Sequence, residues 1–369
     1  MTWRAHSSSW WRRLSPHRSG SGWRPPRLVA SPIRPLPSLP AELRANLPAE
    51  LRGLRRDGVR LMVIDRTAQS IRHARLAELG SFLRAGDLLV VNRSRTIPAA
   101  VAARRSNGEI VQLRLCVRHA EEWHVLCVNP DPPHANVALR VGERLSVAGT
   151  DTVVRGRRAD LPLLWRIDAL SEGIERMLRS GEPIRYSYVP EPVPLSHYET
   201  VYANEPGSAE TPSAGRSLSW ELLLDLRRQG IDLSDILLHT GLSSLQDDAV
   251  DAEHPLFEEW FAVPPNAAQA VNRVPRVIAV GTTVVRALET AAGHDGHARA
   301  MEGWTRLRLG PGSPLRVVDG LLTGFHEPQA SHFDLLRAFL AEPLLDRAYR
   351  EAIAERYLWH EFGDLCLIL

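Results

Sequence analysis

The apolar residues of this chain follow two different patterns, and the change between them is what most constrains the fold. Residues 61–65 and 87–92 are short apolar runs rich in branched residues and bounded by turn formers, as expected of buried strands. From about residue 99 to 181, short alternating runs follow one another without a long helical period. We expect them to form a small antiparallel β-barrel inserted into a larger domain. The alternating runs are 110–116, 123–128, 143–147, 152–155 and 163–167.

After Pro183 the pattern changes to strands that alternate with helices. Residues 220–230 have helical spacing, and an apolar run at 276–280 turns through Gly281 into a helix that begins at Thr282 or Thr283. This alternation predicts an α/β main domain. The other expected elements are strands at 236–238, 317–323 and 364–369 and helices at 266–272, 333–340 and 344–357.

The first 38 residues differ in composition from the rest of the chain. They are rich in Arg, Trp, Ser and Pro, and they hold seven of the 45 arginines but none of the 43 acidic residues. We expect a disordered extension or a wrongly assigned start, since the apolar centre of a secretory signal is absent, although such a composition can imitate a transit peptide. The expected domains are a disordered extension at 1–38, an α/β main domain at 39–98 and 184–369, and the barrel at 99–183.

The overall composition excludes several classes of protein. Of the 369 residues, 44% are hydrophobic and 24% charged, which is typical of a soluble globular protein. No apolar run approaches the ~18 residues that span a bilayer, so we expect no membrane partner. Cys116, Cys127 and Cys366 form no C-x-x-C pair, which argues against a zinc ribbon or a three-thiolate iron–sulfur site and favours a reducing cytoplasm.

All 45 basic residues are arginines, because the sequence contains no lysine. Catalysis through a lysine Schiff base or a lysine general base is therefore excluded. A GC-rich genome is the simple explanation for the bias. With seven arginines in the first 38 residues, the remainder has a net charge of −5, so any contact with RNA must use a local basic patch.

The turn from Gly281 to Arg286 is one candidate binding site. A strand, a tight turn and a helix start present free amides and the positive end of the helix dipole, which can hold a carboxylate or a phosphate. Thr282 and Thr283 lie at the helix start, and Arg286 lies about one turn further on. The structural alternative is an ordinary connection with threonine capping and a surface pair between Arg286 and Glu289. The G-x-G-x-x-G fingerprint of a Rossmann nucleotide site is absent after any predicted strand.

Two histidines follow predicted strands, at the positions where ligand sites of α/β sheets form. His239 follows the run at 236–238, and His326 follows the run at 317–323. Either imidazole can transfer a proton near neutral pH, and Asp319 is the carboxylate expected to orient His326 if the sheet brings them together. Each histidine can equally be a structural residue. We expect no metal site: the sequence around His294 and His297 is interpreted as a linker.

The loop after residues 87–91 carries an amide and two guanidinium groups. Asn92, Arg93 and Arg95 lie there, and they can contact a substrate or a phosphate of RNA. A solvated loop is the equally weighted alternative.

Taken in order, these segments resemble the S-adenosylmethionine:tRNA ribosyltransferase-isomerase family over about nine-tenths of the chain. The strongest similarity lies at residues 86–98, at 198–203, where the family has Y-Q-T-V-Y-A, and at 276–289. Shorter matches lie at 57–61, 65–66, 212–215, 238–242, 303–305, 311–312, 318–319, 325–326 and 363–364.

The resemblance implies an α/β domain with an inserted β-barrel and an unusual reaction. In that reaction S-adenosylmethionine, as co-substrate, donates its ribosyl group to 7-aminomethyl-7-deazaguanine in tRNA, which gives epoxyqueuosine and releases adenine and methionine. The chemistry requires an acid or base near the ribose, polar contacts for the methionine carboxylate and adenine, and a basic surface for the anticodon arm of tRNA. We accordingly expect a cytoplasmic monomer.

Two motif histidines of the family are replaced in this chain. Ser217 stands where the family has the histidine of A-P-T-A-G-L-H-F-T, and Phe257 stands at a histidine of H-x-M-H-S-E, although His254 and Glu259 remain. Three interpretations stay open: the family enzyme itself, a paralogue that uses S-adenosylmethionine on a different acceptor, and a binding protein without catalysis.

Overall fold

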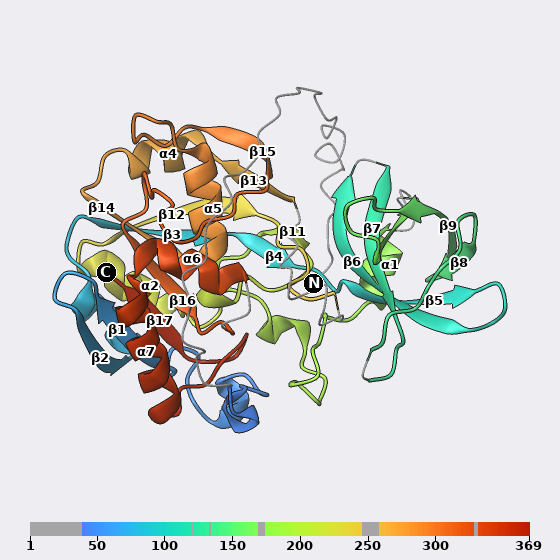
Figure 1. Ribbon diagram of the computed structural model, residues 1–369, viewed down its shortest axis with the longest axis horizontal. Helices are drawn as coiled ribbons and strands as arrows, with labels where there is room; N and C mark the ends of the chain where they lie inside the picture. The colour runs from blue at the N-terminus through green and yellow to red at the C-terminus, as the bar shows by residue number, and fades with distance from the viewer. Residues whose placement is uncertain (1–38, 120, 133, 169–173, 246–257, 328–330) are drawn as a thin grey trace.

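The main domain and the barrel lie side by side in the computed structural model of the chain (Figure 1). The structure describes residues 39–119, 121–132, 134–168, 174–245, 258–327 and 331–369. Among these residues, no helix has both the length and the apolar character that crossing a membrane requires.

A mixed sheet forms the centre of the main domain. Nine of the described strands pair in the order β15, β13, β12, β3, β14, β16, β17, β1, β2. Strands β12, β3, β14 and β16 run parallel to one another, so their carboxyl ends lie along one edge of the sheet. The strands are β1 (Arg60–Asp65), β2 (Ser70–Arg75), β3 (Asp87–Asn92), β12 (Asp232–Leu238), β13 (Glu259–Val263), β14 (Arg276–Val280), β15 (Met301–Thr305), β16 (Gly320–Gly324) and β17 (Leu365–Ile368).

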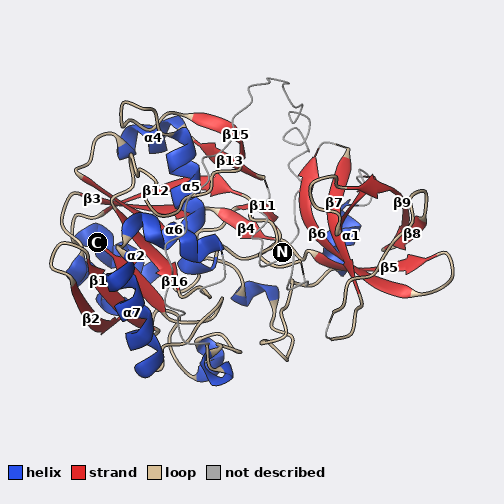
Figure 2. Cartoon of the chain, viewed as in Figure 1, coloured by secondary structure: helices blue, strands red, loops and turns tan. Residues whose placement is uncertain are grey.

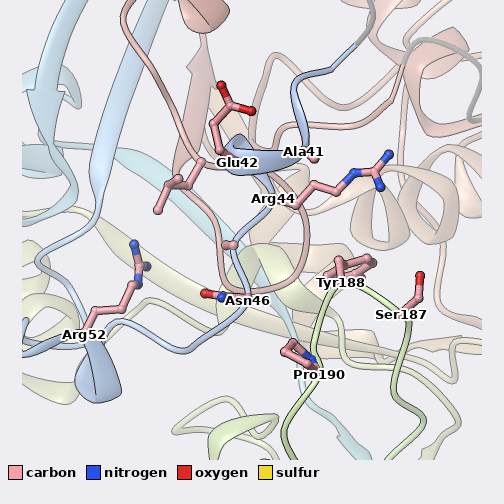
Figure 3. Close-up of a pocket in the computed structure, with 10 residues that line it drawn as sticks. Ala41, Glu42, Arg44, Asn46, Arg52, Ser187, Tyr188 and Pro190 are labelled. Carbon is pink, nitrogen blue, oxygen red and sulfur yellow. The ribbon is translucent and has the colours of Figure 1, made fainter. Parts of the chain in front are cut away.

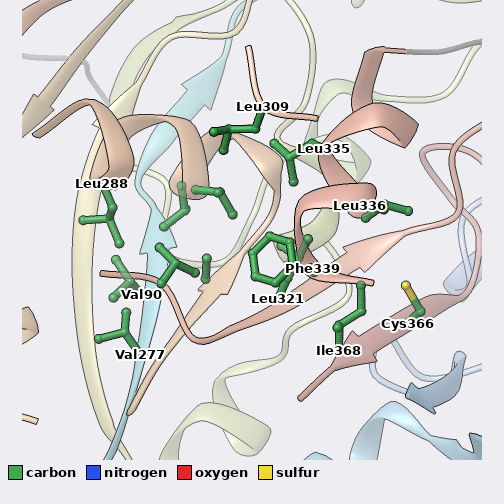
Figure 4. Close-up of a cluster of buried hydrophobic side chains, with 14 of the residues drawn as sticks. Val90, Val277, Leu288, Leu309, Leu321, Leu335, Leu336, Phe339, Cys366 and Ile368 are labelled. Atoms are coloured by element: carbon green, nitrogen blue, oxygen red, sulfur yellow. The ribbon is translucent and has the colours of Figure 1, made fainter. Parts of the chain in front are cut away.

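Helices cover both faces of this sheet, because its strands alternate between two apolar cores. On β3, Leu88 and Val90 face one core while Leu89 and Val91 face the other. The first core lies under α4 (Pro265–Val271), α5 (Thr282–Ala291), α6 (Ser331–Phe339) and α7 (Glu342–Ala354), and Figure 4 shows part of it. The second core lies under α2 (Trp220–Arg228) and a 3-10 helix at Leu76–Phe82. Strands β3, β14 and β16 are therefore buried on both sides, as is the carboxyl half of β12.

The barrel is closed and antiparallel, in the order β10, β7, β6, β5, β8, β9. Its inward side chains form a separate core, and Figure 2 shows that strands dominate this part of the molecule. A short helix α1 (Ile174–Ser180) follows the last strand. The strands are β5 (Ala100–Arg105), β6 (Ile110–His119), β7 (Glu122–Val128), β8 (Arg144–Val147), β9 (Thr150–Arg157) and β10 (Leu164–Asp168).

The predicted fold class is confirmed, and the main differences are strands that the sequence patterns did not predict. Edge strand β2 was not predicted, because Ser70–Arg75 is largely polar and exposed on both faces. Strands β13 and β15 were also missed, because their short alternating runs mix tryptophan with charged residues. Barrel strand β5 was missed too, since it begins with alanines and ends in arginines. Strand β16 begins at Gly320, later than the predicted residue 317, because Val317 and Val318 bind the Glu289 carboxylate through their amides.

Candidate functional site

The carboxyl edge of the parallel strands gathers several of the predicted residues. His239 follows β12, Asn92 ends β3, Gly281 follows β14 and His326 lies two residues beyond β16. A small parallel sheet of β4 (Ser94–Thr96) and β11 (Glu205–Ser208) lies between this edge and the barrel (Figure 1). Ligand sites of open α/β sheets form at such an edge.

His239 is held in one orientation at this edge. Its Nδ1 lies 2.8 Å from Ser94 Oγ, and its ring stacks on Trp260 with centroids 5.8 Å apart. Gly207 permits this packing, because a Cβ there would lie 2.4 Å from the imidazole. Burial, together with the nearby charge of Arg93, lowers the pKa of His239 to about 4. The imidazole is therefore neutral at pH 7 and can accept a proton.

Of the three residues predicted to contact a substrate or RNA, Asn92 is buried, whereas Arg93 and Arg95 are partly exposed. The side-chain amide of Asn92 bonds to both backbone groups of Leu238, with Nδ2 2.8 Å from the carbonyl oxygen and Oδ1 3.0 Å from the amide nitrogen. This side chain fastens β3 to β12, so an RNA contact through Asn92 is wrong. The arginines have carboxylate partners: Arg93 pairs with Asp235 at 3.0 Å and Glu205 at 3.3 Å, and Arg95 pairs with Glu199 at 3.3 Å.

The tight turn predicted at Gly281 is present. Gly281 has φ of 93°, a conformation that favours glycine, and a Cβ there would lie 3.3 Å from that of Ala214. Helix α5 begins at the next residue, with Thr282 and Thr283 both buried in its first turn. Within the described residues, the hydroxyl of Thr283 has no hydrogen-bond partner. A buried donor at a helix start can bind an anionic ligand.

Arg286 is buried in α5, and its guanidinium group binds other groups of the protein. Its Nη1 pairs with Glu259 and its Nε donates to the Leu307 carbonyl at 3.0 Å. The same Glu259 accepts from the Gly241 amide at 2.9 Å, so Arg286 also holds the loop that follows His239. Its Nη2 has no partner among the described residues. The alternative surface pair with Glu289 is wrong, since both residues are buried.

His326 lies at the carboxyl end of β16, where its Nε2 is 2.9 Å from Thr323 Oγ1. Burial, with smaller contributions from His332 and His360, lowers the pKa of His326 well below its usual value. Asp319 does not orient this imidazole. It precedes the amino end of β16, roughly 20 Å away at about 3.3 Å per strand residue, and its carboxylate accepts from the Val277 amide at 2.8 Å.

Sequence reasoning missed a polar cluster where the barrel joins the main domain. Glu210 follows β11, and its Oε1 accepts from the Tyr186 hydroxyl and from the Ser243 amide at 2.8 Å. Glu361 lies in the loop between α7 and β17, close to Tyr188 and Glu210. Neither glutamate has a local sequence signal. Only the position of Glu361 two residues before the matched segment 363–364 could have suggested it.

A cavity of about 390 Å³ shares one lining residue, Tyr188, with this cluster (Figure 3). Tyr188 forms one wall, and its ring stacks on His360 with centroids 4.3 Å apart. Arg44 and Arg52 also line the cavity: Arg44 pairs with Glu327 at 3.4 Å, and Arg52 donates to the Phe362 carbonyl at 2.8 Å. The cavity thus combines an aromatic wall with two guanidinium groups.

One group of side chains could hold a metal ion by position. The ligand atoms of His119, His124 and Glu258 lie within 4.8 Å of one another. Glu258, however, already binds Arg158 at 2.5 Å and Arg306 at 2.6 Å. Burial opposes ionisation of this carboxyl, but the hydrogen bonds from His119 and Arg158 hold its pKa well below the usual value. The arrangement is an ion-pair network that ties the barrel to strands β13 and β15.

The fold and these sites define an α/β protein with an inserted β-barrel and polar groups gathered at the sheet edge and the domain junction. The model of the family described as queuosine biosynthesis protein matches residues 38–368, and the chain belongs to this family. The S-adenosylmethionine:tRNA ribosyltransferase-isomerase of Heliobacterium modesticaldum is 37% identical over 346 residues, covering 90% of this chain and 97% of the relative. The protein of the same name from Thermus thermophilus is 38% identical, covering 85% and 93%.

A solved structure has the same architecture. The crystal structure of the S-adenosylmethionine tRNA ribosyltransferase from Thermotoga maritima is similar to this chain with a TM-score of 0.51 and 28% identity, covering 90% of this chain and 99% of that one. The two replaced motif positions can now be placed. Ser217 is buried, beside Arg216, which pairs with Glu50 at 2.6 Å, whereas Phe257 lies outside the described residues.

Proposed function

We propose that the protein transfers and isomerises the ribosyl group of S-adenosylmethionine onto 7-aminomethyl-7-deazaguanine in tRNA. The observation that carries this proposal is the family match over residues 38–368, together with the shared name of relatives that align with almost their whole length. The reaction as proposed uses S-adenosylmethionine as co-substrate and uses no metal ion.

The turn at Gly281 is proposed to bind the methionine carboxylate of the donor. Thr282 and Thr283 bring the start of α5 to the sheet edge, and the Thr283 hydroxyl, unpartnered within the described residues, is available to a ligand. Arg286 is held in place by its ion pair with Glu259. Its Nη2, which has no partner among the described residues, can donate to the methionine carboxylate of the donor.

His239 and His326 are proposed as proton acceptors of the reaction. Both rings are desolvated, so both are neutral at pH 7, and each ring is oriented by a hydroxyl, from Ser94 and Thr323 respectively. A neutral, oriented imidazole at the edge of a sheet suits proton abstraction from a bound substrate. Asp319 has no part in this proposal.

The tRNA contact is proposed to lie on the barrel rather than on the loop at residues 92–95. Arg104, Arg144 and Arg157 are exposed on β5, β8 and β9, which are neighbouring strands. Arginines on adjacent strands form the local basic patch that a chain with an acidic main body requires. We infer that the protein acts as a monomer.

The test is adenine release from S-adenosylmethionine. The purified protein is incubated with the donor and with tRNA that carries 7-aminomethyl-7-deazaguanine, and the same tRNA with guanine at that position is the control. We expect adenine and epoxyqueuosine-containing tRNA only with the modified substrate. Absence of both products would overturn the proposal, whereas adenine release that ignores the tRNA would favour the paralogue with a different acceptor.

A further inference from the structure

The cavity of about 390 Å³ is built from three segments that are distant in the sequence (Figure 3). Its lining residues come from 41–52 near the start of the main domain, from 187–190 on the way out of the barrel, and from Leu358 in the loop after α7. Ligand sites for small molecules have volumes from about 300 Å³ upward. Among the described residues, the lining includes neither His239 nor His326, so the cavity is distinct from the sites at the sheet edge.

The lining of the cavity is positively charged. It carries the guanidinium groups of Arg44 and Arg52 and one carboxylate, that of Glu42, which is exposed and lies 3.9 Å from Arg356. Arg52 donates from Nη2 to the Phe362 carbonyl at 2.8 Å, but it forms no ion pair with any described carboxylate. Its Nε is buried and has no partner within the described part of the chain. A guanidinium group without a counter-ion is suited to bind a phosphate.

The aromatic wall of the cavity is held in place by residues that pack around it. The ring of Tyr188 stacks on His360, with centroids 4.3 Å apart and an angle of 14° between the planes. The Nε2 of His360 lies 3.4 Å from Glu327 Oε1, and Arg44 contacts the same oxygen at 3.4 Å. Glu327 thus links one of the two arginines of the cavity to its aromatic wall.

His360 supports this wall from a strained backbone conformation. Its φ is 71°, in the left-handed region that few residues other than glycine occupy. The turn is closed by Gly363, whose amide donates to the His360 carbonyl at 3.1 Å and where a Cβ would lie 2.5 Å from the Leu358 carbonyl oxygen. Backbone strain of this kind persists where the surroundings enforce it, and it is concentrated at ligand sites. The conformation of His360 therefore indicates a binding role for Tyr188 independently of the charges.

We propose that this cavity binds one unstacked nucleotide of the tRNA substrate, with its base against Tyr188 and its phosphates on Arg44 and Arg52. The proposal rests on the proposed function, because it takes tRNA as the substrate. Bases of single-stranded RNA stack on aromatic side chains, while basic groups bind the phosphates between them. A nucleotide inside a chain has a phosphate on each side, which matches the two guanidinium groups of the lining. The exposed arginines of the barrel, in contrast, present no aromatic partner in the proposed patch and would contact phosphates only.

The first test removes the stacking surface. The dissociation constant of tRNA that carries 7-aminomethyl-7-deazaguanine is measured by fluorescence anisotropy for wild type, Tyr188→Leu and Tyr188→Phe. Leucine fills space but has no aromatic face, so we expect binding at least about fivefold weaker, whereas phenylalanine keeps the ring and should stay within about twofold of wild type. The Michaelis constant for tRNA should follow the same order, with kcat at saturating tRNA changed less than about twofold. Wild-type affinity in Tyr188→Leu would overturn the inference.

The second test removes a phosphate contact and does not depend on the folding of Tyr188→Leu. Arg52→Gln should weaken tRNA binding about tenfold at low salt, and it should reduce the slope of log affinity against log salt by about 0.7, the share of one phosphate in a single strand. Arg66→Gln is the matched control: Arg66 is also partly exposed and donates to a backbone carbonyl, that of Leu369 at 3.1 Å, but it lies beside Asp319 beyond the amino end of β16. An unchanged slope in Arg52→Gln, or an equal loss of affinity in both variants, would overturn the phosphate contact.

The outcomes separate this inference from the proposed function. If wild type releases adenine with the modified tRNA and all the cavity variants bind that tRNA normally, the inference alone is overturned. If wild type releases no adenine but binds the tRNA through Tyr188 and Arg52, the inference is supported and the proposed reaction fails. Calorimetry with adenosine 5′-diphosphate is the last arm. Binding that depends on Tyr188, together with unaffected tRNA affinity, would assign the cavity to a free nucleotide and overturn the inference.

Discussion

The sheet edge and the domain junction respond to burial in opposite ways. At the edge, desolvation lowers the pKa of His239 to about 4 and that of His326 well below its usual value. At the junction, desolvation raises the pKa of Glu210 and brings that of Glu361 to about 8. In each case the charged form is disfavoured, because neither region offers it enough compensation.

The difference teaches how one fold can supply both halves of proton transfer at a single pH. A neutral imidazole accepts a proton, whereas a neutral carboxyl group donates one. The sheet edge therefore holds imidazoles suited to accept a proton, and the junction holds carboxyl groups that burial favours in the protonated form. Strand β11, which pairs with β4, leads into Glu210 at the junction. Groups whose environments push their pKa values apart are suited to separate acid and base roles.

The largest effect is expected when a proposed proton acceptor, His239 or His326, is removed. We expect His239→Ala or His326→Ala to lower turnover in the adenine-release assay by ~100-fold or more, with little change in donor binding, because each removes a positioned base. His297→Ala, in an exposed turn, is the control. Near-normal turnover in both variants would show that these histidines are structural. The pKa differences between the sheet edge and the junction would then affect only the stability of the fold.

The elements of this comparison were unequally visible in the sequence. The run at Arg276–Val280, the turn at Gly281 and the start of α5 were predicted because local signals agree: branched apolar residues, then glycine, then a helical period. His239 and His326 could be placed at an edge because they directly follow predicted strands. The neutral state of the two imidazoles could not be predicted, since it depends on burial by segments that are remote in the sequence.

The polar cluster at the domain junction could not be predicted from the sequence, for a different reason. Glu210 and Glu361 are 151 positions apart and lie in loops without periodicity, so only the tertiary fold brings them together. Asn92 shows the converse error. Its polar side chain at a loop indicated a substrate contact, yet both atoms of the amide bind the backbone of a neighbouring strand. Local sequence does not distinguish a polar group used by the fold from one left for a ligand.

An intermediate effect is expected at the donor site. Arg286→Ala should weaken binding of S-adenosylmethionine by a factor equivalent to ~1.5–3 kcal/mol, the range of a charged hydrogen bond. Isothermal calorimetry gives this number directly. Because the substitution also leaves Glu259 buried without its arginine, Glu259→Gln is the control: it disturbs the ion pair but keeps the guanidinium.

Two outcomes would contradict this assignment. If the wild-type protein does not bind S-adenosylmethionine, the donor site is wrong and the enzyme proposals fail with it. If Glu259→Gln weakens donor binding as much as Arg286→Ala does, the guanidinium acts only by holding the loop at Gly241 and makes no contact with the donor.

The smallest effect is expected from Asp319, which sequence reasoning paired with His326. Its carboxylate accepts from the Val277 amide at the amino end of β16, whereas His326 lies beyond the carboxyl end of the same strand. Asp319→Ala should therefore change kcat by less than about twofold. Because the substitution leaves the amide of buried Val277 without this acceptor, it should lower the free energy of unfolding by about 1–3 kcal/mol. Steady-state kinetics and urea unfolding measure the two quantities. A tenfold loss of kcat without a change in stability would mean that the two ends of β16 are coupled, and that the acceptors at the sheet edge depend on groups at the opposite edge.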